Sequence, residues 1–123
     1  MKKKIFSLIL AFSLFFGIAS NAFAAAKITP ADQTILGTHT TASWTLSWSG
    51  GPSGWYMVYF KPDSKYDYKI IDYSTTLTSK RHSEQYLIRE NAAFHYPQLK
   101  VVDLEDPGMV VGVAQARVYQ KGY

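Results

Sequence analysis

Histidines are the most versatile catalytic side chains in this sequence, and the chain has three of them, His39, His82 and His95. Zinc sites bring histidines together at short, recognisable spacings, whereas these three lie far apart. A Ser-His-Asp arrangement needs only convergence in space, so the spacing leaves it open. No nucleophile-elbow pattern surrounds a serine, because Gly51-Pro-Ser-Gly54 lacks the required spacing. We therefore predict that the chain is not an enzyme and uses no metal or cofactor.

An acidic stretch is the second candidate for chemistry. Asp103, Glu105 and Asp106 precede Gly108, and three carboxylates in four residues would supply charge for a calcium ion. Their spacing matches no known calcium-loop signature, so we expect a solvated acidic turn. The chain has no cysteine, which excludes thiolate catalysis, thiolate metal sites and disulfides.

The net charge gives no reason to expect a nucleic-acid partner. The whole chain has 13 basic and 9 acidic residues and a formal net charge of +4, which falls to +1 without the N-terminal Lys2, Lys3 and Lys4. Beyond them, Lys80-Arg81-His82 is the only basic cluster, and we expect it to lie in a solvated turn. Nucleic-acid binding requires a clustered basic surface, so we predict no such partner.

The first 24 residues have the organisation of a secretory signal peptide. The three lysines precede an apolar run, Ile5–Ala19, and then Ala22-Phe23-Ala24, a small-x-small cleavage pattern. A membrane anchor is the alternative, but the run is short for a span of about 20 residues. We predict cleavage after Ala24, with Ala26 as a second candidate position, and one mature domain over residues 25–123. The protein is then secreted without a stable membrane anchor, and its retention at the cell surface is left open.

Two strands and the turn between them organise the mature chain. In residues 41–48, apolar residues alternate with Thr and Ser, which predicts a strand with one buried and one wet face. The apolar row is Ala42, Trp44, Leu46 and Trp48. Three glycines and a proline follow within six residues and predict a turn. Both faces of the next strand, Trp55–Phe60, are apolar, so it is either covered on both sides or presents one aromatic face to a partner.

The rest of the chain shows short strand patterns between turn signals and no convincing helix. Pro30 divides a predicted edge strand into halves, and Pro97 implies an edge or a bulge, because proline cannot donate to a ladder. We expect Lys80–Glu84 to be a loop, and Gln85–Glu90 is too short to separate a strand from a helical turn. The other expected strand segments are Lys27–Thr29, Thr34–Leu36, Tyr66–Tyr73, Ser74–Ser79, Ala92–Asp103 and Met109–Tyr119. This pattern predicts an all-β sandwich or small barrel.

The strand motifs resemble those of a known family. Trp44-x-Leu46-x-Trp48, a short loop and Tyr56-x-Val58-x-Phe60 resemble the second and third strands of a fibronectin type III or related immunoglobulin-like module. Leu99-x-Val101, a turn at Gly108 and a final strand resemble the end of that fold. The resemblance covers most of the mature chain in outline and implies an antiparallel β-sandwich that serves as a binding or spacer unit. The family usually has a tyrosine where this chain has Pro97, and Tyr96 lies one place away.

The resemblance also orients the second strand. If Tyr56, Val58 and Phe60 face the core, the other row faces outward, where aromatic rings stack on sugars or anchor proteins. The residues expected to bind a ligand are Trp55, Met57, Tyr59, Tyr66 and Tyr68. We predict a secreted, non-catalytic binding module for a cell-wall or extracellular glycan or a protein. In the alternatives, these rings only complete a small core, or the protein is a matrix component, hydrolase inhibitor or small toxin acting through loops or edge strands.

Overall fold

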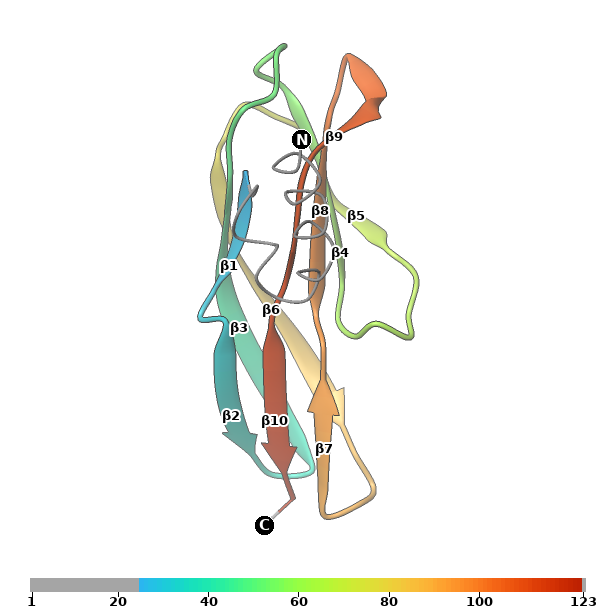
Figure 1. Cartoon of the computed structure of the whole chain (residues 1–123). Helices are drawn as coiled ribbons and strands as arrows, with labels where there is room; N and C mark the ends of the chain where they lie inside the picture. Colours follow the sequence, from blue (N-terminus) through green and yellow to red (C-terminus); the bar gives the residue numbers. More distant parts are fainter. Residues whose placement is uncertain (1–24, 123) are drawn as a thin grey trace, which may run out of the picture.

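The computed structural model describes residues 25–122, and all regular elements in this range are β-strands (Figure 1). The predicted signal peptide, residues 1–24, lies outside the described residues. No helix in the described range is long and apolar enough to cross a membrane. The strands are β1 (Ala26–Thr29), β2 (Asp32–Leu36), β3 (His39–Trp48), β4 (Tyr56–Lys61), β5 (Lys69–Thr75), β6 (Ser79–Leu87), β7 (Ala92–His95), β8 (Gln98–Asp103), β9 (Asp106–Gln115) and β10 (Arg117–Lys121).

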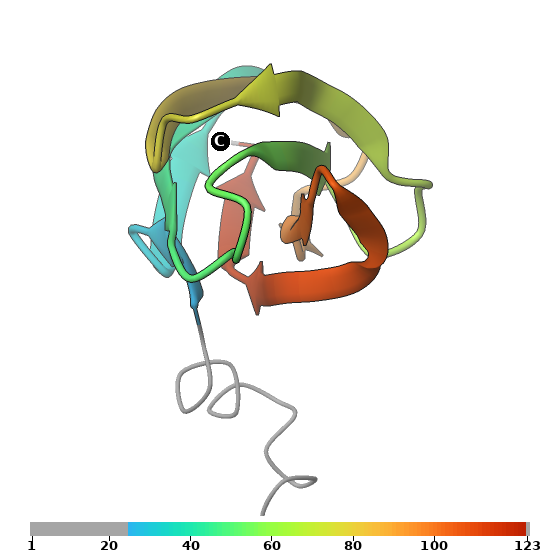
Figure 2. The same ribbon diagram turned by 90° about the horizontal axis from the view of Figure 1, so that it is seen from above.

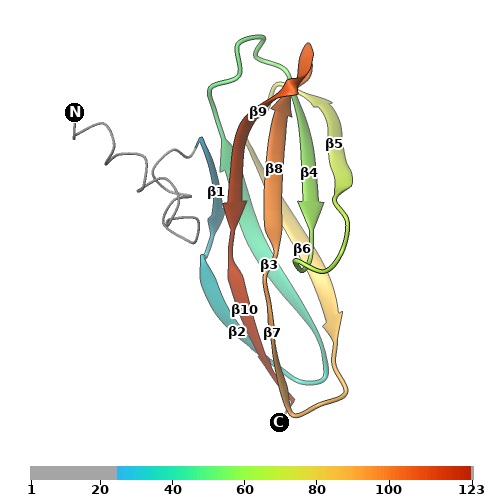
Figure 3. The ribbon, with the colours of Figure 1, turned by 45° about the vertical axis from the view of Figure 1, so that its right-hand side comes forward.

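Three sheets surround one hydrophobic core. Their strand orders are β1-β3-β6, β2-β10-β7 and β5-β4-β8-β9. Seen from above in Figure 2, the strands curve around a common interior. In Figure 3, β7 runs on into β8 and β9 runs on into β10, so the second and third sheets follow one another along one side of the molecule. The predicted all-β sandwich class is confirmed.

The core is organised by the two apolar rows of β3 and β4. Every second residue of β3 from Ala42 to Trp48 is buried. The loop 49–55 then carries the chain to β4 in a different sheet, where Tyr56, Val58 and Phe60 are buried. Aromatic contacts join the two rows. The ring centroids of Trp44 and Phe60 are 5.3 Å apart, and those of Trp48 and Tyr56 are 6.3 Å apart. The inward orientation predicted for this row of β4 is therefore confirmed.

Pro30 marks a point at which the chain changes sheets. It separates β1, which pairs with β3, from β2, which pairs with β10. Both are terminal strands of their sheets, so the edge position predicted for the two halves is confirmed. The pairing of β2 with β10 is parallel, whereas all other pairings between the described strands are antiparallel, as expected.

Pro97 has a larger effect than the predicted edge or bulge. The segment Ala92–Asp103, expected as one strand, divides into β7, which pairs with β10, and β8, which lies between β4 and β9. Met109–Tyr119 divides in the same way at Ala116, whose amide donates to the carbonyl of Pro97 at 3.0 Å. Both single-strand predictions were wrong because the missing amide of proline interrupts the ladder, and the chain resumes in a different sheet.

The prediction of a loop before Gln85 was also wrong. Lys80–Glu84, expected as a loop, lies inside β6, which pairs with β3 along its whole length. The Ser83 hydroxyl hydrogen-bonds that of Ser43 at 2.9 Å, and the Lys80 ammonium lies 4.0 Å from the Asp72 carboxylate of β5. β6 is the terminal strand of its sheet, and charged side chains on such strands discourage further pairing. The polarity of this segment therefore reflects an edge strand rather than a loop.

The connection from β4 to β5 is longer than predicted. β5 runs from Lys69 to Thr75, whereas the sequence suggested strands over Tyr66–Tyr73 and Ser74–Ser79. The carboxylate of Asp63 accepts the Ser64 amide at 2.8 Å, and the Asp63 carbonyl accepts the Tyr66 amide at 3.0 Å. These local bonds favour a turn over strand pairing. Tyr66 and Tyr68 are therefore loop residues, and their spacing does not place them on one face.

The two tryptophans on either side of loop 49–55 should respond differently to substitution. Trp48→Ala should lower the free energy of unfolding by about 3–5 kcal/mol, because it leaves a large cavity in the core, where Trp48 is 3% exposed. Trp55→Ala should cost less than about 1 kcal/mol, since Trp55 is 43% exposed and surface substitutions usually have small effects. Urea denaturation followed by circular dichroism measures both values. Equal losses would contradict the placement of the two rings.

Candidate functional site

A cluster of aromatic and basic side chains lies on the outer face of the four-stranded sheet. β4 buries its even-numbered row in the core, so Met57 and Tyr59 lie on the opposite face of the strand, where Met57 is itself buried at 8% exposure and Tyr59 is half-buried. On the neighbouring β8, Leu99 and Val101 are buried, and Lys100 lies on the outer face directly opposite Tyr59. Tyr68 approaches this row from the connection between β4 and β5. The cluster, which we call the tyrosine face, consists of Met57, Tyr59, Lys61, Tyr68, Gln98 and Lys100.

The two tyrosines of this face pack against each other and hold their hydroxyls in defined positions. Their rings meet edge to face, with centroids 6.3 Å apart and an interplanar angle of 76°. The Tyr59 hydroxyl donates to the Met57 sulfur at 3.4 Å, and the Tyr68 hydroxyl donates to Oε1 of Gln98, also at 3.4 Å. Burial raises the pKa of Tyr68, so this hydroxyl remains protonated and keeps its donor proton.

Two lysines lie over these rings. Nζ of Lys100 is 5.1 Å from the ring centroid of Tyr59 and 5.0 Å from that of Tyr68, and Nζ of Lys61 is 4.7 Å from the centroid of Tyr68. These distances are typical of cation–π contacts. Within residues 25–122, neither ammonium group has a carboxylate at ion-pair distance. Lys61 has one further contact, donating to the Ser64 carbonyl at 3.5 Å.

Three of the five predicted binding residues lie together in the tyrosine face, and Tyr66 lies elsewhere. Met57, Tyr59 and Tyr68 meet in the tyrosine face. Trp55 lies at the start of the same outward row, just before β4, and its carbonyl accepts the Leu104 amide at 2.9 Å. Tyr66 is not part of the face, because it lines a groove on the side of the molecule. The sequence reasoning missed the basic and amide side chains of the face, although their alternation along β4 and β8 matches that of the aromatic residues. They are Lys61, Gln98 and Lys100.

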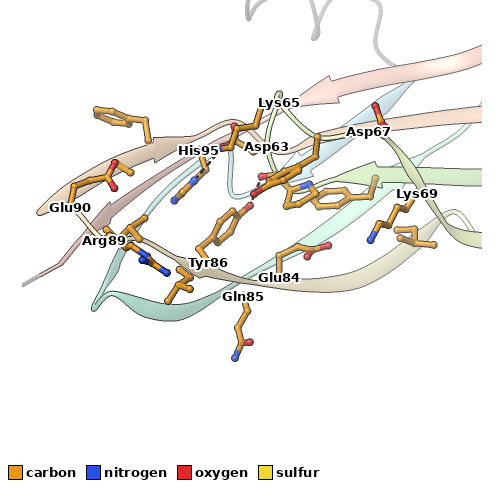
Figure 4. Close-up of a pocket in the computed structure, with 18 residues that line it drawn as sticks. Asp63, Lys65, Asp67, Lys69, Glu84, Gln85, Tyr86, Arg89, Glu90 and His95 are labelled. Carbon is orange, nitrogen blue, oxygen red and sulfur yellow. Dashed lines mark hydrogen bonds and ion pairs between the residues drawn. The ribbon is translucent and has the colours of Figure 1, made fainter.

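That groove has a volume of about 1080 Å³ and lies between β6 on one side and β5, β7 and the β4–β5 connection on the other (Figure 4). Its rim carries charges of both signs, including Lys65, Asp67 and Arg89. Tyr86 and His95 point toward one another inside it, with stacked rings whose centroids are 4.2 Å apart (Figure 4). Both side chains are buried, so the deepest part of the groove is closed by packed rings.

A buried polar network lies behind those rings. His95 Nδ1 is 3.3 Å from the Asp63 carboxylate, and His95 Nε2 is 2.9 Å from Oε1 of Gln120. Nε2 of Gln120 donates to the carbonyls of Gly37 and Tyr86. The Tyr86 hydroxyl donates to the Pro62 carbonyl at 2.6 Å. Burial, followed by the nearby carboxylates of Glu84 and Asp63, raises the pKa of Tyr86, which therefore stays neutral. Because these buried polar atoms have partners, the network serves the fold.

His82 and His95 each lie beside a carboxylate in the described part of the chain. Nε2 of His95 faces the amide of Gln120 and not a hydroxyl that it could activate. His82 lies in β6, 2.7 Å from the Glu84 carboxylate and stacked on Trp44. Residues 25–122 contain no group of three histidine, aspartate or glutamate side chains placed to hold a metal ion.

The acidic turn contains a buried carboxylate. Asp103 is 1% exposed, and its Oδ1 accepts the amide of Ser53 at 3.0 Å and the Ser53 hydroxyl at 2.8 Å. Its Oδ2 accepts the Glu105 amide at 3.2 Å. Although burial alone would raise the pKa of Asp103, these hydrogen bonds and one from the Asp106 amide hold it below the ordinary value. Asp103 therefore joins the loop after β3 to the turn after β8. Of the three carboxylates expected in a solvated turn, only Glu105 lies exposed in the turn, since Asp103 is buried and the exposed Asp106 begins β9.

Comparisons with known proteins bear on the fold. No protein-family model matches the sequence, and no curated protein matches it. The structure is similar to that of WR4, a C. elegans member of the MSP family, with a TM-score of 0.50 over 81% of this chain and 99% of that chain. The two sequences are 8% identical. At this identity the likeness shows the fold alone, a β-sandwich, and does not single out the fibronectin type III type.

Asp103→Asn should lower the melting temperature by several degrees at neutral pH, because an amide cannot accept all the hydrogen bonds now made to the carboxylate. The folded-state pKa lies below the ordinary value of 3.8, so the wild-type carboxylate stabilises the fold above that pH. Its contribution is lost as the pH falls through the folded-state pKa.

Melting curves at a series of pH values down to strong acid therefore test the role of Asp103. The wild type should lose more stability on acidification than Asp103→Asn, and the exposed Glu105→Gln should behave as the wild type. Parallel acid dependence in the wild type and Asp103→Asn would contradict this role.

Proposed function

We propose that the protein is a non-catalytic binding module that holds a cell-wall or extracellular glycan on its tyrosine face. The observation that supports this most is the pairing of Tyr59 and Tyr68 with lysine and amide side chains on one sheet surface. Aromatic rings with polar donors around them offer apolar area and hydrogen bonds at the same place, which is what a sugar requires.

The scaffold favours a preorganised site. Met57, Tyr59 and Lys100 come from adjacent central strands, β4 and β8, which are paired along their length. Side chains held in this way lose little conformational entropy on binding. The resemblance to fibronectin type III modules, which mostly serve as binding or spacer units, agrees with a binding role. Export from the cell, predicted from residues 1–24, would bring the face into contact with extracellular polymers.

Replacing both tyrosines should remove binding while leaving the fold intact. Tyr59→Ala combined with Tyr68→Ala should weaken retention on insoluble polysaccharides or isolated cell walls by at least about tenfold, as expected for aromatic anchors. A pull-down with the purified protein measures this. Circular dichroism melting verifies that the variant is folded, because both positions lie outside the hydrophobic core cluster.

Tyr66→Ala is the matched control. Tyr66 is 53% exposed but lies in the side groove, so this variant should bind as the wild type does. Loss of binding in Tyr66→Ala with retention in the double variant would move the site to the groove. Failure of the wild type to bind any glycan would overturn the proposal.

Self-association through β9 is a second candidate function, in keeping with a matrix protein. β9 is the terminal strand of the four-stranded sheet and packs against Ala26 of β1 at Gly112, while its Val110 and Val113 are 51% and 48% exposed. An apolar terminal strand can pair with another chain. If β9 assembles, sedimentation should show larger species as the concentration rises, and Val113→Lys should return them to monomers. A monomeric wild type at all concentrations would contradict this role.

A further inference from the structure

We infer that the glycan held on the tyrosine face is an acidic polysaccharide whose carboxylates pair with Lys61 and Lys100. This inference rests on the proposed function and specifies its ligand class. It starts from the charges of the face. Both ammonium groups lie over the single ring of Tyr68, at 4.7 Å and 5.0 Å from its centroid. The two nitrogens therefore lie within about 10 Å of each other, close to one Debye length at physiological salt.

Two like charges at that separation repel each other, and the described residues offer neither of them a carboxylate at ion-pair distance. The quadrupoles of the tyrosine rings attract them, which accounts for their positions. An anionic ligand would form the ion pairs with these two lysines that the described part of the protein does not provide. Charge complementarity therefore favours an acidic ligand over a neutral one.

The positions of the lysines also disfavour a neutral sugar. Flat stacking of a sugar requires an accessible ring face, and here Lys100 lies over the rings of Tyr59 and Tyr68 and Lys61 lies over that of Tyr68. A neutral sugar would have to displace ammonium groups from favourable contacts. An acidic sugar can keep them in place, because its carboxylate pairs with Nζ from the solvent side.

A second aromatic and basic pair, on the strands that continue from β8 and β9, favours a polymer. Phe94 and Tyr119, cross-strand neighbours on β7 and β10, have ring centroids 4.8 Å apart, and the guanidinium of Arg117 lies 5.4 Å over Phe94. Arg117 also pairs with Asp32 at 2.8 Å, so its charge is partly balanced.

This second pair is connected to the tyrosine face by one row of side chains along the chain, although Phe94 also lines the side groove. The odd-numbered residues 95 to 101 are buried and the even-numbered residues from Phe94 to Lys100 are not, so the outward row continues from β7 into β8. At about 3.3 Å per residue, Phe94 lies about 20 Å from Lys100 along it. A chain of repeating acidic sugars would reach both places, whereas a single small anion would occupy one.

Binding of polygalacturonate and of its methyl ester tests the inference, because the two polymers share a backbone and differ in charge. In isothermal titration at low salt, the protein should bind polygalacturonate at least about tenfold more tightly than the methyl ester. Lys61→Ala combined with Lys100→Ala should remove most of this preference. The control variant, Lys27→Ala with Lys69→Ala, removes the same charge from exposed positions outside the face. It should retain the preference for polygalacturonate.

Each other outcome overturns the inference. Equal binding of the two polymers, or equal losses in both double variants, would show that the charge of the face does not select the ligand. Preference for a poly(glycerol phosphate) over polygalacturonate would assign the site to phosphate and not to a carboxylated sugar. Retention on a neutral polysaccharide that depends on Tyr59 and Tyr68, without binding of polygalacturonate, would overturn the acidic ligand and leave the proposed function standing.

Discussion

The packing of β3 against β4 determines most of this structure. These strands are neighbours in sequence but belong to different sheets, so the loop between them connects the two sheets, and the ring of Trp44 packs on that of Phe60. Burying one row of β4 obliges the other row to face outward. The tyrosine face is therefore a direct consequence of the core: Tyr59 is held where it is because its neighbours Val58 and Phe60 are buried. A site built on a strand in this way inherits the rigidity of the core beneath it.

Sequence alone was sufficient for this part of the fold because strand alternation is a local property. It was not sufficient where the outcome depends on distant partners. The polar segment Lys80–Glu84 reads as a loop, yet it pairs with β3 as the exposed edge of a sheet. Pro97 indicates an interruption of the strand. Whether the strand resumes in the same sheet or in another depends on the segment that pairs with it, here the one that contains Ala116. The parallel pairing of β2 with β10 cannot be predicted from the sequence of either segment, since both are short and half polar.

The candidate site, like the fold, could be predicted from the sequence only in part. Met57 and Tyr59 follow from the orientation of β4, but Tyr66 was placed on the face by a strand pattern that does not exist, because local hydrogen bonds to Asp63 turn the chain there. Lys100 was overlooked because a lysine on a strand usually indicates only solvent. Its proximity to two tyrosines depends on the register of β4 and β8, which no single segment encodes. The buried pairing of His95 with Asp63 likewise joins residues whose neighbours in sequence are unremarkable.

The pairing of β2 with β10 also constrains how the domain can fold. It joins segments 85 residues apart at Arg117 and Asp32, and the inner side of β10 contributes Val118 and Gln120, both fully buried. Topologies closed by such distant contacts have a high contact order and acquire their native structure slowly. The sheet of β2, β10 and β7 cannot form until the last strand has emerged from the ribosome. Until β10 is in place, the core lacks the cover of Val118 and Gln120, so the interior of the domain is completed only at the end of folding.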